Sequence, residues 1–114
     1  MDFKSSNKFE TRLSESEKIM KKYPNRVPII VERHKKSTLN EIRKNKYLAP
    51  RDLNMNEFIY IIRRNINLDK SESIFVMVGN QISPSNVSLG VVYEDNKDED
   101  GFLYVTYTSE NTFG

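Results

Sequence analysis

Apolar side chains recur at helical spacing near the start of the chain. The stripe comprises Phe9, Leu13, Ser16, Met20 and Tyr23, with Ile19 beside it. Asn7, followed three positions later by Glu10, matches the spacing of a capping box, so we expect a helix to begin after Asn7. Pro24 ends it, because proline lacks an N–H donor and clashes with the preceding turn. A short helical turn before Asn7 is compatible with the sequence.

The next segments alternate between strand and helix composition. Val27–Arg33 is rich in β-branched residues and predicts a strand, in which Pro28 is tolerated only at the start or at an edge. Lys46–Pro50 predicts a short second strand, and residues 39–45 between the two strands predict a loop because their apolar positions keep no period.

A second amphipathic helix follows. Asn54 and Glu57 repeat the capping spacing. The wide apolar face of this helix comprises Met55, Phe58, Ile61, Ile62 and Ile66.

The last third of the chain predicts two more strands and a short helix. Ile74–Val78 is a compact apolar run typical of a central strand, and Ser88–Glu94 favours a short helix. Asn96–Asp100 predicts an acidic, solvated turn, and Phe102–Tyr107 predicts the final strand. This order of elements predicts a single α+β domain, which suits a chain of 114 residues.

Composition excludes several kinds of chemistry. The chain has no cysteine, so it forms no disulfide, no thiolate zinc site and no cysteine nucleophile. It has no apolar run of membrane-spanning length and no glycine-rich phosphate loop. Its one histidine, His34, lies in a basic turn without a nucleophile nearby, and Asp98–Asp100 lack the spacing of a calcium loop. We therefore expect no enzyme activity, no catalytic residue, no cofactor and no metal.

Charge is unevenly distributed. All but one of the 18 Lys and Arg residues lie before position 71, whereas the remainder of the chain is acidic. A basic front suits acidic peptides, anionic lipid or nucleic acid, although a highly charged surface also divides this way by chance. The pairs at 35–36, 43–44 and 63–64 would suit a nucleic-acid or cytoskeletal binder, but no stacking motif or recognition helix accompanies them, so nucleic acid is not expected.

Several blocks of sequence together resemble one known family. They are residues 21–33 with their two prolines, Lys46–Pro50, residues 57–64, residues 100–105 and the final Phe113-Gly114. In order and spacing they resemble the autophagy modifiers of the gamma-aminobutyric-acid-receptor-associated protein and microtubule-associated protein light chain three type. The resemblance covers nearly the whole chain.

The resemblance implies a fold and a function. The fold is a ubiquitin-like β-grasp with two additional N-terminal helices, divided into a helical extension (1–24), a ubiquitin-like core (25–108) and a flexible conjugation tail (109–114). The implied function is conjugation of Gly114 to phosphatidylethanolamine by activating and conjugating enzymes, after any processing by a protease. The protein would be a monomer in the cytoplasm and, once lipidated, would lie on autophagosomes and other vesicle membranes.

The same resemblance implies a groove for adaptor and cargo-receptor peptides of the pattern aromatic-x-x-aliphatic. The aromatic pocket would comprise Glu15, Ile19, Pro28, Ile30, Lys46, Leu48 and Phe102. The aliphatic pocket would comprise Tyr47, Ala49, Pro50, Leu53, Phe58 and Ile61. Arg26 and Lys46 would hold acidic residues flanking the motif. If Lys46–Pro50 is an edge strand, the peptide adds to it by β-augmentation, and we expect its alternate side chains to enter pockets on one face.

Some features keep alternatives open. Ile30, Leu48, Phe58, Ile61 and Phe102 also suit a plain hydrophobic core, and for Phe58 and Ile61 the core role is as well supported as the pocket role. Asn65 and Ala49 depart from the family pattern of a basic residue and a valine, which alters one contact and enlarges the aliphatic pocket. The alternative functions are a non-conjugated ubiquitin-like adaptor and a microtubule or vesicle-trafficking binding module.

Overall fold

A computed structural model describes residues 2–109. Two helices come first, α1 (Phe3–Ser6) and α2 (Phe9–Lys22), followed by strands β1 (Arg26–Arg33) and β2 (Lys46–Pro50). Helix α3 (Met55–Asn65) precedes β3 (Phe75–Val78) and β4 (Gln81–Ile82), and α4 (Leu89–Asn96) precedes β5 (Leu103–Thr108). The predicted α+β class is confirmed, and β4 is the one element that the sequence analysis missed.

The five strands form one mixed sheet in the order β2-β1-β5-β3-β4. β1 and β5 run parallel, and the other neighbours run antiparallel. β2 therefore lies at one edge, as the β-augmentation prediction requires. β5 lies at the centre, whereas β3, predicted as a central strand, lies one place from the far edge.

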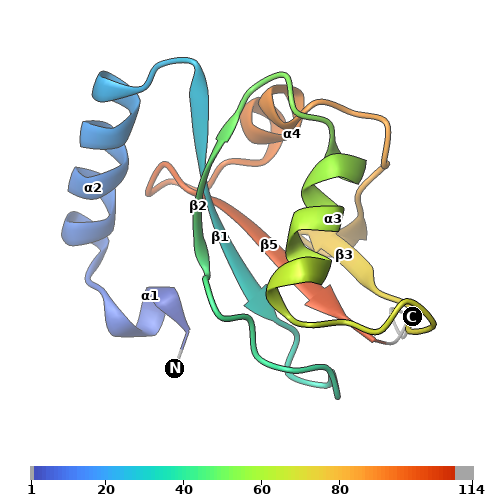
Figure 1. Cartoon of the computed structure of the whole chain (residues 1–114). Helices are drawn as coiled ribbons and strands as arrows, with labels where there is room; N and C mark the ends of the chain where they lie inside the picture. The colour runs from blue at the N-terminus through green and yellow to red at the C-terminus, as the bar shows by residue number, and fades with distance from the viewer. Residues whose placement is uncertain (1, 110–114) are drawn as a thin grey trace.

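Helices cover both faces of the sheet (Figure 1). α3 and α4 pack on one face, where Phe58 and Ile62 of α3 meet inward-facing residues of β1 such as Ile29 in the main core. α1 and α2 lie on the other face, over a smaller cluster formed by Phe3, Ile30 and Phe102. Successive side chains of β1 point to opposite faces of the sheet, so Ile29 joins the main core and Ile30 joins the smaller cluster.

The helix starts were predicted with mixed success. Asn54 caps α3 as expected, since its side chain accepts a hydrogen bond from the Glu57 N–H and Glu57 accepts one from the Asn54 N–H. The corresponding prediction for Asn7 and Glu10 is wrong. Asn7 instead ends α1, where its side-chain amide donates to the Phe3 carbonyl, and Lys8 precedes α2 without a side-chain cap.

The buried face of α2 also differs from the predicted stripe. Phe9 and Tyr23 are each 39% exposed, whereas Arg12 and Ser16 are buried. These polar residues face the sheet because they bond to the turn before β5, as described below. Within residues 2–109, no helix is long and apolar enough to cross a membrane.

Candidate functional site

The open edge of β2 is the starting point of the site. Leu48 lies opposite Pro28 of β1, which has no N–H to donate. The Val31 N–H donates to the Asn45 carbonyl at 2.7 Å, so the backbone N–H and carbonyl groups of Val31, and of every second residue before it in β1, point toward β2. The backbone groups of Pro28 therefore point away from β2. Its partner Leu48 likewise points its N–H and carbonyl away from β1, toward the open edge. The Arg26 guanidinium already donates to that carbonyl at 3.4 Å.

The predicted aromatic-pocket residues come together on the face covered by α1 and α2. Pro28 and Ile30 of β1 pair with Leu48 and Lys46 of β2, respectively. Phe102 lies just before β5 and is fully buried with Ile30. From α2, Ile19 borders the same cluster.

Lys46 and Glu15 connect the edge strand to α2. The Lys46 Nζ lies 2.6 Å from a Glu15 carboxylate oxygen, and both side chains are partly exposed. Lys46 is therefore paired with Glu15 rather than free in solvent. The ion pair joins two members of the predicted aromatic set that are far apart in the sequence.

Five of the six predicted aliphatic-pocket residues, all except Pro50, lie on the opposite face. Tyr47 and Ala49 are buried against α3, and the Tyr47 ring meets the Phe58 ring edge-on at 5.5 Å. Leu53 and Ile61 are half-buried beside that core, and Pro50 is exposed at the end of β2. The prediction that both pockets share one face is wrong. Successive residues of a strand point to opposite faces, so positions three apart also do so.

Phe58 and Tyr47 belong mainly to the core. Phe58 is fully buried, and burial raises the pKa of Tyr47 to about 12. Among the described atoms, no hydrogen-bonding partner reaches the Tyr47 hydroxyl. Leu53 and Ile61 are therefore the members of this set that remain accessible beside Tyr47, Ala49 and Phe58, whereas Pro50 follows the strand alternation of Lys46 and Leu48.

A buried polar cluster fixes α2 over the sheet. Asp100 is fully buried, and its carboxylate accepts hydrogen bonds from the Arg12 guanidinium and the Tyr104 hydroxyl. Its backbone carbonyl accepts a hydrogen bond from the Ser16 hydroxyl. Burial, reinforced by the Asp100 carboxylate, raises the pKa of Tyr104 well above its usual value. The prediction of a solvated acidic turn is thus wrong for Asp100.

This cluster adjoins residues of the predicted aromatic pocket. Arg12 and Ser16 flank Glu15 on α2, and Asp100 precedes Phe102 by two residues. The Phe102 N–H donates to the Asp100 carboxylate at 2.9 Å. Sequence reasoning placed Asp100 in a solvated turn, because a bond between positions 12 and 100 leaves no periodic signal.

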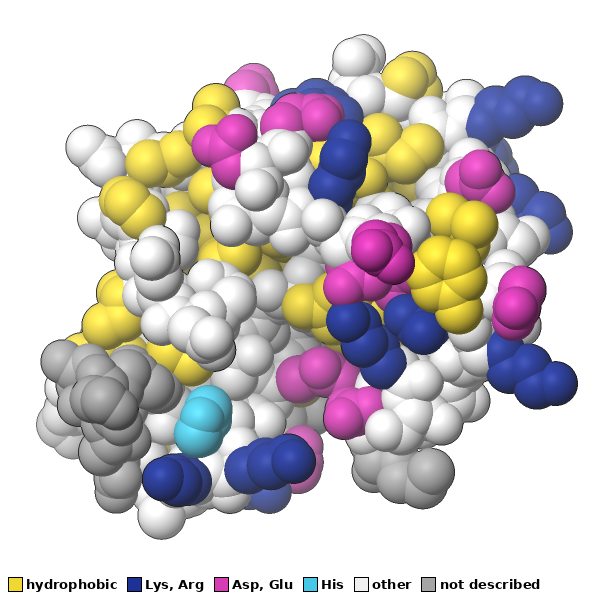
Figure 2. Space-filling model, turned by 180° about the vertical axis from the view of Figure 1, so that it is seen from behind, with side chains coloured by type: hydrophobic (Ala, Val, Ile, Leu, Met, Phe, Trp, Pro, Cys, Tyr) yellow, Lys and Arg dark blue, Asp and Glu magenta, His cyan; other side chains and the backbone are white. Residues whose placement is uncertain are grey.

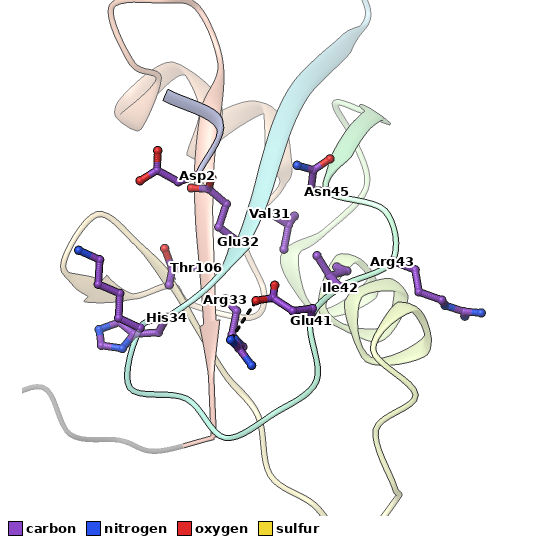
Figure 3. A pocket seen from close by; sticks show the side chains of 11 residues that line it. Asp2, Val31, Glu32, Arg33, His34, Glu41, Ile42, Arg43, Asn45 and Thr106 are labelled. Carbon is purple, nitrogen blue, oxygen red and sulfur yellow. Dashed lines mark ion pairs between the residues drawn. The ribbon is translucent and has the colours of Figure 1, made fainter. Parts of the chain in front are cut away.

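A second concave region lies at the far end of β1 (Figure 3). Asp2, Glu32, Arg33, Glu41 and Arg43 are among the residues that line this cleft of about 800 Å³. Arg33 and Glu41 form an ion pair across it at 2.9 Å. Charges of both signs alternate around the cleft, and among residues 2–109 no group of three or more histidine or acidic side chains is placed to hold a metal.

Two of the basic pairs considered above for a nucleic-acid or cytoskeletal binder, 43–44 and 63–64, contribute hydrogen bonds to nearby loops. Arg43 donates to the carbonyls of Arg64 and Asn65 at the end of α3. Arg63 donates to the carbonyls of Asp69 and Glu72. Their guanidinium groups thus stabilise the loops on either side of α3. Space-filling Figure 2 shows basic side chains beside the histidine at one end of the molecule, interspersed with acidic ones.

Comparison with known proteins places this geometry in a family. Residues 11–114 match the family model described as "Autophagy protein Atg8 ubiquitin like". The chain is 49% identical to autophagy-related protein 8a of Arabidopsis thaliana over 112 residues, which are 98% of this chain and 92% of that protein. It is 48% identical to autophagy-related protein 8 of Vanderwaltozyma polyspora, covering 98% and 95% of the two chains.

Two solved structures of Atg8 proteins have the same fold as this chain. The structure of Trypanosoma brucei ATG8 superposes with a TM-score of 0.91 at 36% identity, over 100% of this chain and 98% of that one. Plasmodium falciparum Atg8 in complex with a Plasmodium falciparum Atg3 peptide superposes with a TM-score of 0.90 at 36% identity, over 96% and 97%.

The fold is therefore that of a ubiquitin-like modifier with two helices added before the sheet, and not that of an enzyme. The chain belongs to the Atg8 family of ubiquitin-like autophagy proteins. The family resemblance, the β-grasp fold and the function as an autophagy modifier are confirmed at this level. The individual site residues stay predictions, and Gly114 lies outside the described residues.

Proposed function

We propose that this protein is attached through the Gly114 carboxylate to the amine of phosphatidylethanolamine. ATP activates the carboxylate as an acyl adenylate with release of pyrophosphate, and a cysteine thiol of the activating enzyme then displaces AMP. The acyl group passes to a cysteine of the conjugating enzyme, and the lipid amine releases that thiol as the amide forms. Glycine suits this sequence because no side chain crowds its acyl carbon. Where residues follow Gly114 in a precursor, a processing protease exposes the carboxylate first.

Membrane attachment would follow from the two acyl chains of the lipid. Each buried methylene contributes about 0.8 kcal/mol, and one myristoyl-length chain gives only marginal binding. Two chains hold a protein stably until the amide is hydrolysed. The protein would then divide between the cytoplasm and autophagosome or other vesicle membranes according to its lipidation.

We also propose that β2 accepts an extended aromatic-x-x-aliphatic peptide as an added strand. The observation that carries this proposal is the placement of the two predicted residue sets on opposite faces of one open edge. Side chains three apart in a strand point to opposite faces, so one peptide reaches both sets. Arg26 and Lys46, at either end of the pairing with β1, would attract acidic residues that flank the motif.

The partners follow from this chemistry. They are cargo receptors and adaptors that carry such motifs, together with the conjugation enzymes. The Atg3 peptide bound to the Plasmodium falciparum relative supports a peptide of the conjugation machinery as one ligand. Two anchors of about 2 kcal/mol each, less the cost of ordering the peptide, give an affinity near micromolar, which suits a reversible adaptor contact.

Reconstituted lipidation tests the first proposal. The protein is incubated with activating and conjugating enzymes, ATP and liposomes that contain phosphatidylethanolamine. We expect a lipid-linked product that disappears in Gly114→Ala and persists in the control Asn111→Ala. Absence of the product from the unaltered protein, with peptide binding intact, would instead favour the non-conjugated adaptor.

Peptide titration tests the second proposal. We expect Leu48→Ala to weaken an aromatic-x-x-aliphatic peptide by about tenfold, because an apolar anchor contact is lost. Ile82→Ala is the matched control, since Ile82 is an exposed aliphatic residue on the opposite edge strand β4. Equal affinity of Leu48→Ala and the unaltered protein would contradict the pocket assignment.

A further inference from the structure

Phe3 of α1 is buried against the residues assigned to the aromatic pocket. Its side chain is only 8% exposed and forms one cluster with Ile30 and Phe102, bordered by Ile19. The Phe3 and Phe102 rings meet edge-on at 5.3 Å, and the Lys46 Nζ lies 5.2 Å from the centre of the Phe3 ring. Phe3 thus shares one cluster with Ile30 and Phe102 and lies close to Lys46, three of the seven residues of that predicted pocket.

Outside this cluster α1 is held by polar contacts, including the Lys4 Nζ 4.7 Å from the centre of the Tyr104 ring and an Arg12 hydrogen bond to the Asn7 carbonyl. The Phe3 N–H donates to the Glu32 carboxylate at 2.7 Å, and Lys4 forms an ion pair with Asp98 at 2.6 Å. The Lys4 side chain is 49% exposed, and partly exposed ion pairs contribute little to stability. A four-residue helix also has no stability of its own. The docking of Phe3 is therefore the main contact that keeps α1 on the sheet.

The surroundings leave α1 room to move. Asp2, which caps α1, and Glu32 line the cleft at the end of β1, so the start of α1 borders open space (Figure 3). Figure 1 shows α1 at the end of the helical layer, where the chain continues from it into α2. Local opening of such a peripheral segment requires far less free energy than global unfolding.

We propose that Phe3 is an internal occupant of the aromatic pocket and that α1 must withdraw before a peptide places its aromatic side chain there. This inference rests on the proposed peptide-binding function. Two aromatic rings cannot both pack on Ile30 and Phe102 beneath Lys46, so closed α1 and bound peptide exclude each other. The measured dissociation constant is then the intrinsic one divided by the fraction of molecules in which α1 is open.

A fixed-wall role for Phe3 has the opposite consequence. If Phe3 lined the pocket and contacted the peptide, its removal would weaken binding. The sign of the change therefore distinguishes an occupant from a wall.

Calorimetric titration with an aromatic-x-x-aliphatic peptide measures that sign. We expect Phe3→Ala to bind about threefold tighter or better, because the competitor is removed. Lys4→Ala, which loosens α1 without altering the pocket, should bind tighter by a smaller factor. Lys8→Ala, another exposed lysine close in sequence, is the charge-matched control and should bind like the unaltered protein.

Fluorescence of Phe3→Trp reports the movement directly, because the chain has no other tryptophan. A peptide whose aromatic residue is phenylalanine should shift the emission to longer wavelength as the indole leaves the cluster. Unchanged emission on saturation, or weaker binding by Phe3→Ala, would overturn the inference.

The variant Leu48→Ala separates this inference from the proposed function. If it weakens binding while Phe3→Ala and Lys4→Ala fail to tighten it, the peptide groove stands and internal occupancy is wrong. If the unaltered protein and Phe3→Ala both fail to bind, or Leu48→Ala has no effect, the peptide groove itself is wrong.

Discussion

The Tyr47 side chain of the edge strand has a well-packed ring and a buried, unpaired hydroxyl. Its ring packs in the core against Phe58, but its buried hydroxyl has no hydrogen-bonding partner among the described atoms. We expect Tyr47→Phe to raise the free energy of unfolding by about 1 kcal/mol, since an unpaired buried hydroxyl is destabilising. Urea denaturation measures this, with Tyr60→Phe, whose side chain is exposed, as control. A loss of stability in Tyr47→Phe would reveal a partner for the hydroxyl.

The same residue predicts an alkaline limit of stability. Burial raises the pKa of Tyr47 from 10.0 to about 12. A raised pKa means that the folded state holds the proton more tightly, so its contribution is complete below pH 10 and is lost as the pH rises through 12. We expect the free energy of unfolding to fall over this window and to fall less in Tyr47→Phe. Tyr107, whose pKa burial also raises to about 12, accounts for a remaining decline.

Gly101 permits the close approach of α2 to the turn before β5. Its φ is +88°, and a Cβ there would lie 2.3 Å from the Ser16 hydroxyl oxygen. Gly101→Ala should destabilise the fold by about 3 kcal/mol through backbone strain and this overlap. Ser16→Gly also removes the hydroxyl bond to the Asp100 carbonyl, so thermal denaturation should show that it costs less stability in the Gly101→Ala chain than in the unaltered chain. Equal costs in the two chains would mean that backbone strain alone accounts for the loss.

At the scale of elements, the position of α2 depends on one buried ion pair. Arg12→Met leaves the Asp100 carboxylate buried without its cation, which costs about 3 kcal/mol or more. Lys18→Met, an exposed position on the same helix, should cost less than about 0.5 kcal/mol. Guanidinium denaturation compares the two variants. Equal stabilities would mean that the ion pair does not hold α2.

The elements differ in how far the sequence could predict them. The capping box of α3 was predictable because Asn54, Glu57 and the apolar face all favour the same helix. The start of α2 was not, because Asn7 satisfies a carbonyl of α1, a helix too short to leave a periodic pattern. β4 has two residues and no alternation to detect. Phe3 went unnoticed because its neighbours in sequence are polar and its contacts come from distant strands.

At the scale of the whole molecule, the sequence blocks pointed to residues that the fold gathers around β2. The edge position of β2 was a condition of the peptide-binding prediction, and the strand order supplies it. The sequence blocks did not indicate that the two sets lie on opposite faces, which follows from the strand alternation together with the register of Pro28 against Leu48. The polar bonds that fix α2 were likewise hidden, since they join residues 12 and 16 to residue 100.

The uneven charge along the sequence becomes uneven charge in space. The predominantly basic residues 1–70 supply α1, α2, β1 and the open edge β2, whereas α4 carries acidic residues. We expect the association rate of a peptide with acidic flanks to fall about tenfold between 50 mM and 500 mM salt, with little change in its dissociation rate. Stopped-flow mixing measures both rates. A peptide with neutral flanks should show a much smaller dependence, and equal salt dependence of the two peptides would argue against electrostatic steering.

The central place of β5 has a mechanical consequence. The segment that ends in Gly114 continues directly from this strand, and β5 is hydrogen-bonded to β1 on one side and β3 on the other. When a membrane tethers that segment and a cargo-bearing partner holds β2, tension between them loads the strands along their length. All the bonds of a ladder then share the force at once instead of opening in succession. We therefore expect the domain to transmit a pull from cargo to bilayer while it stays folded.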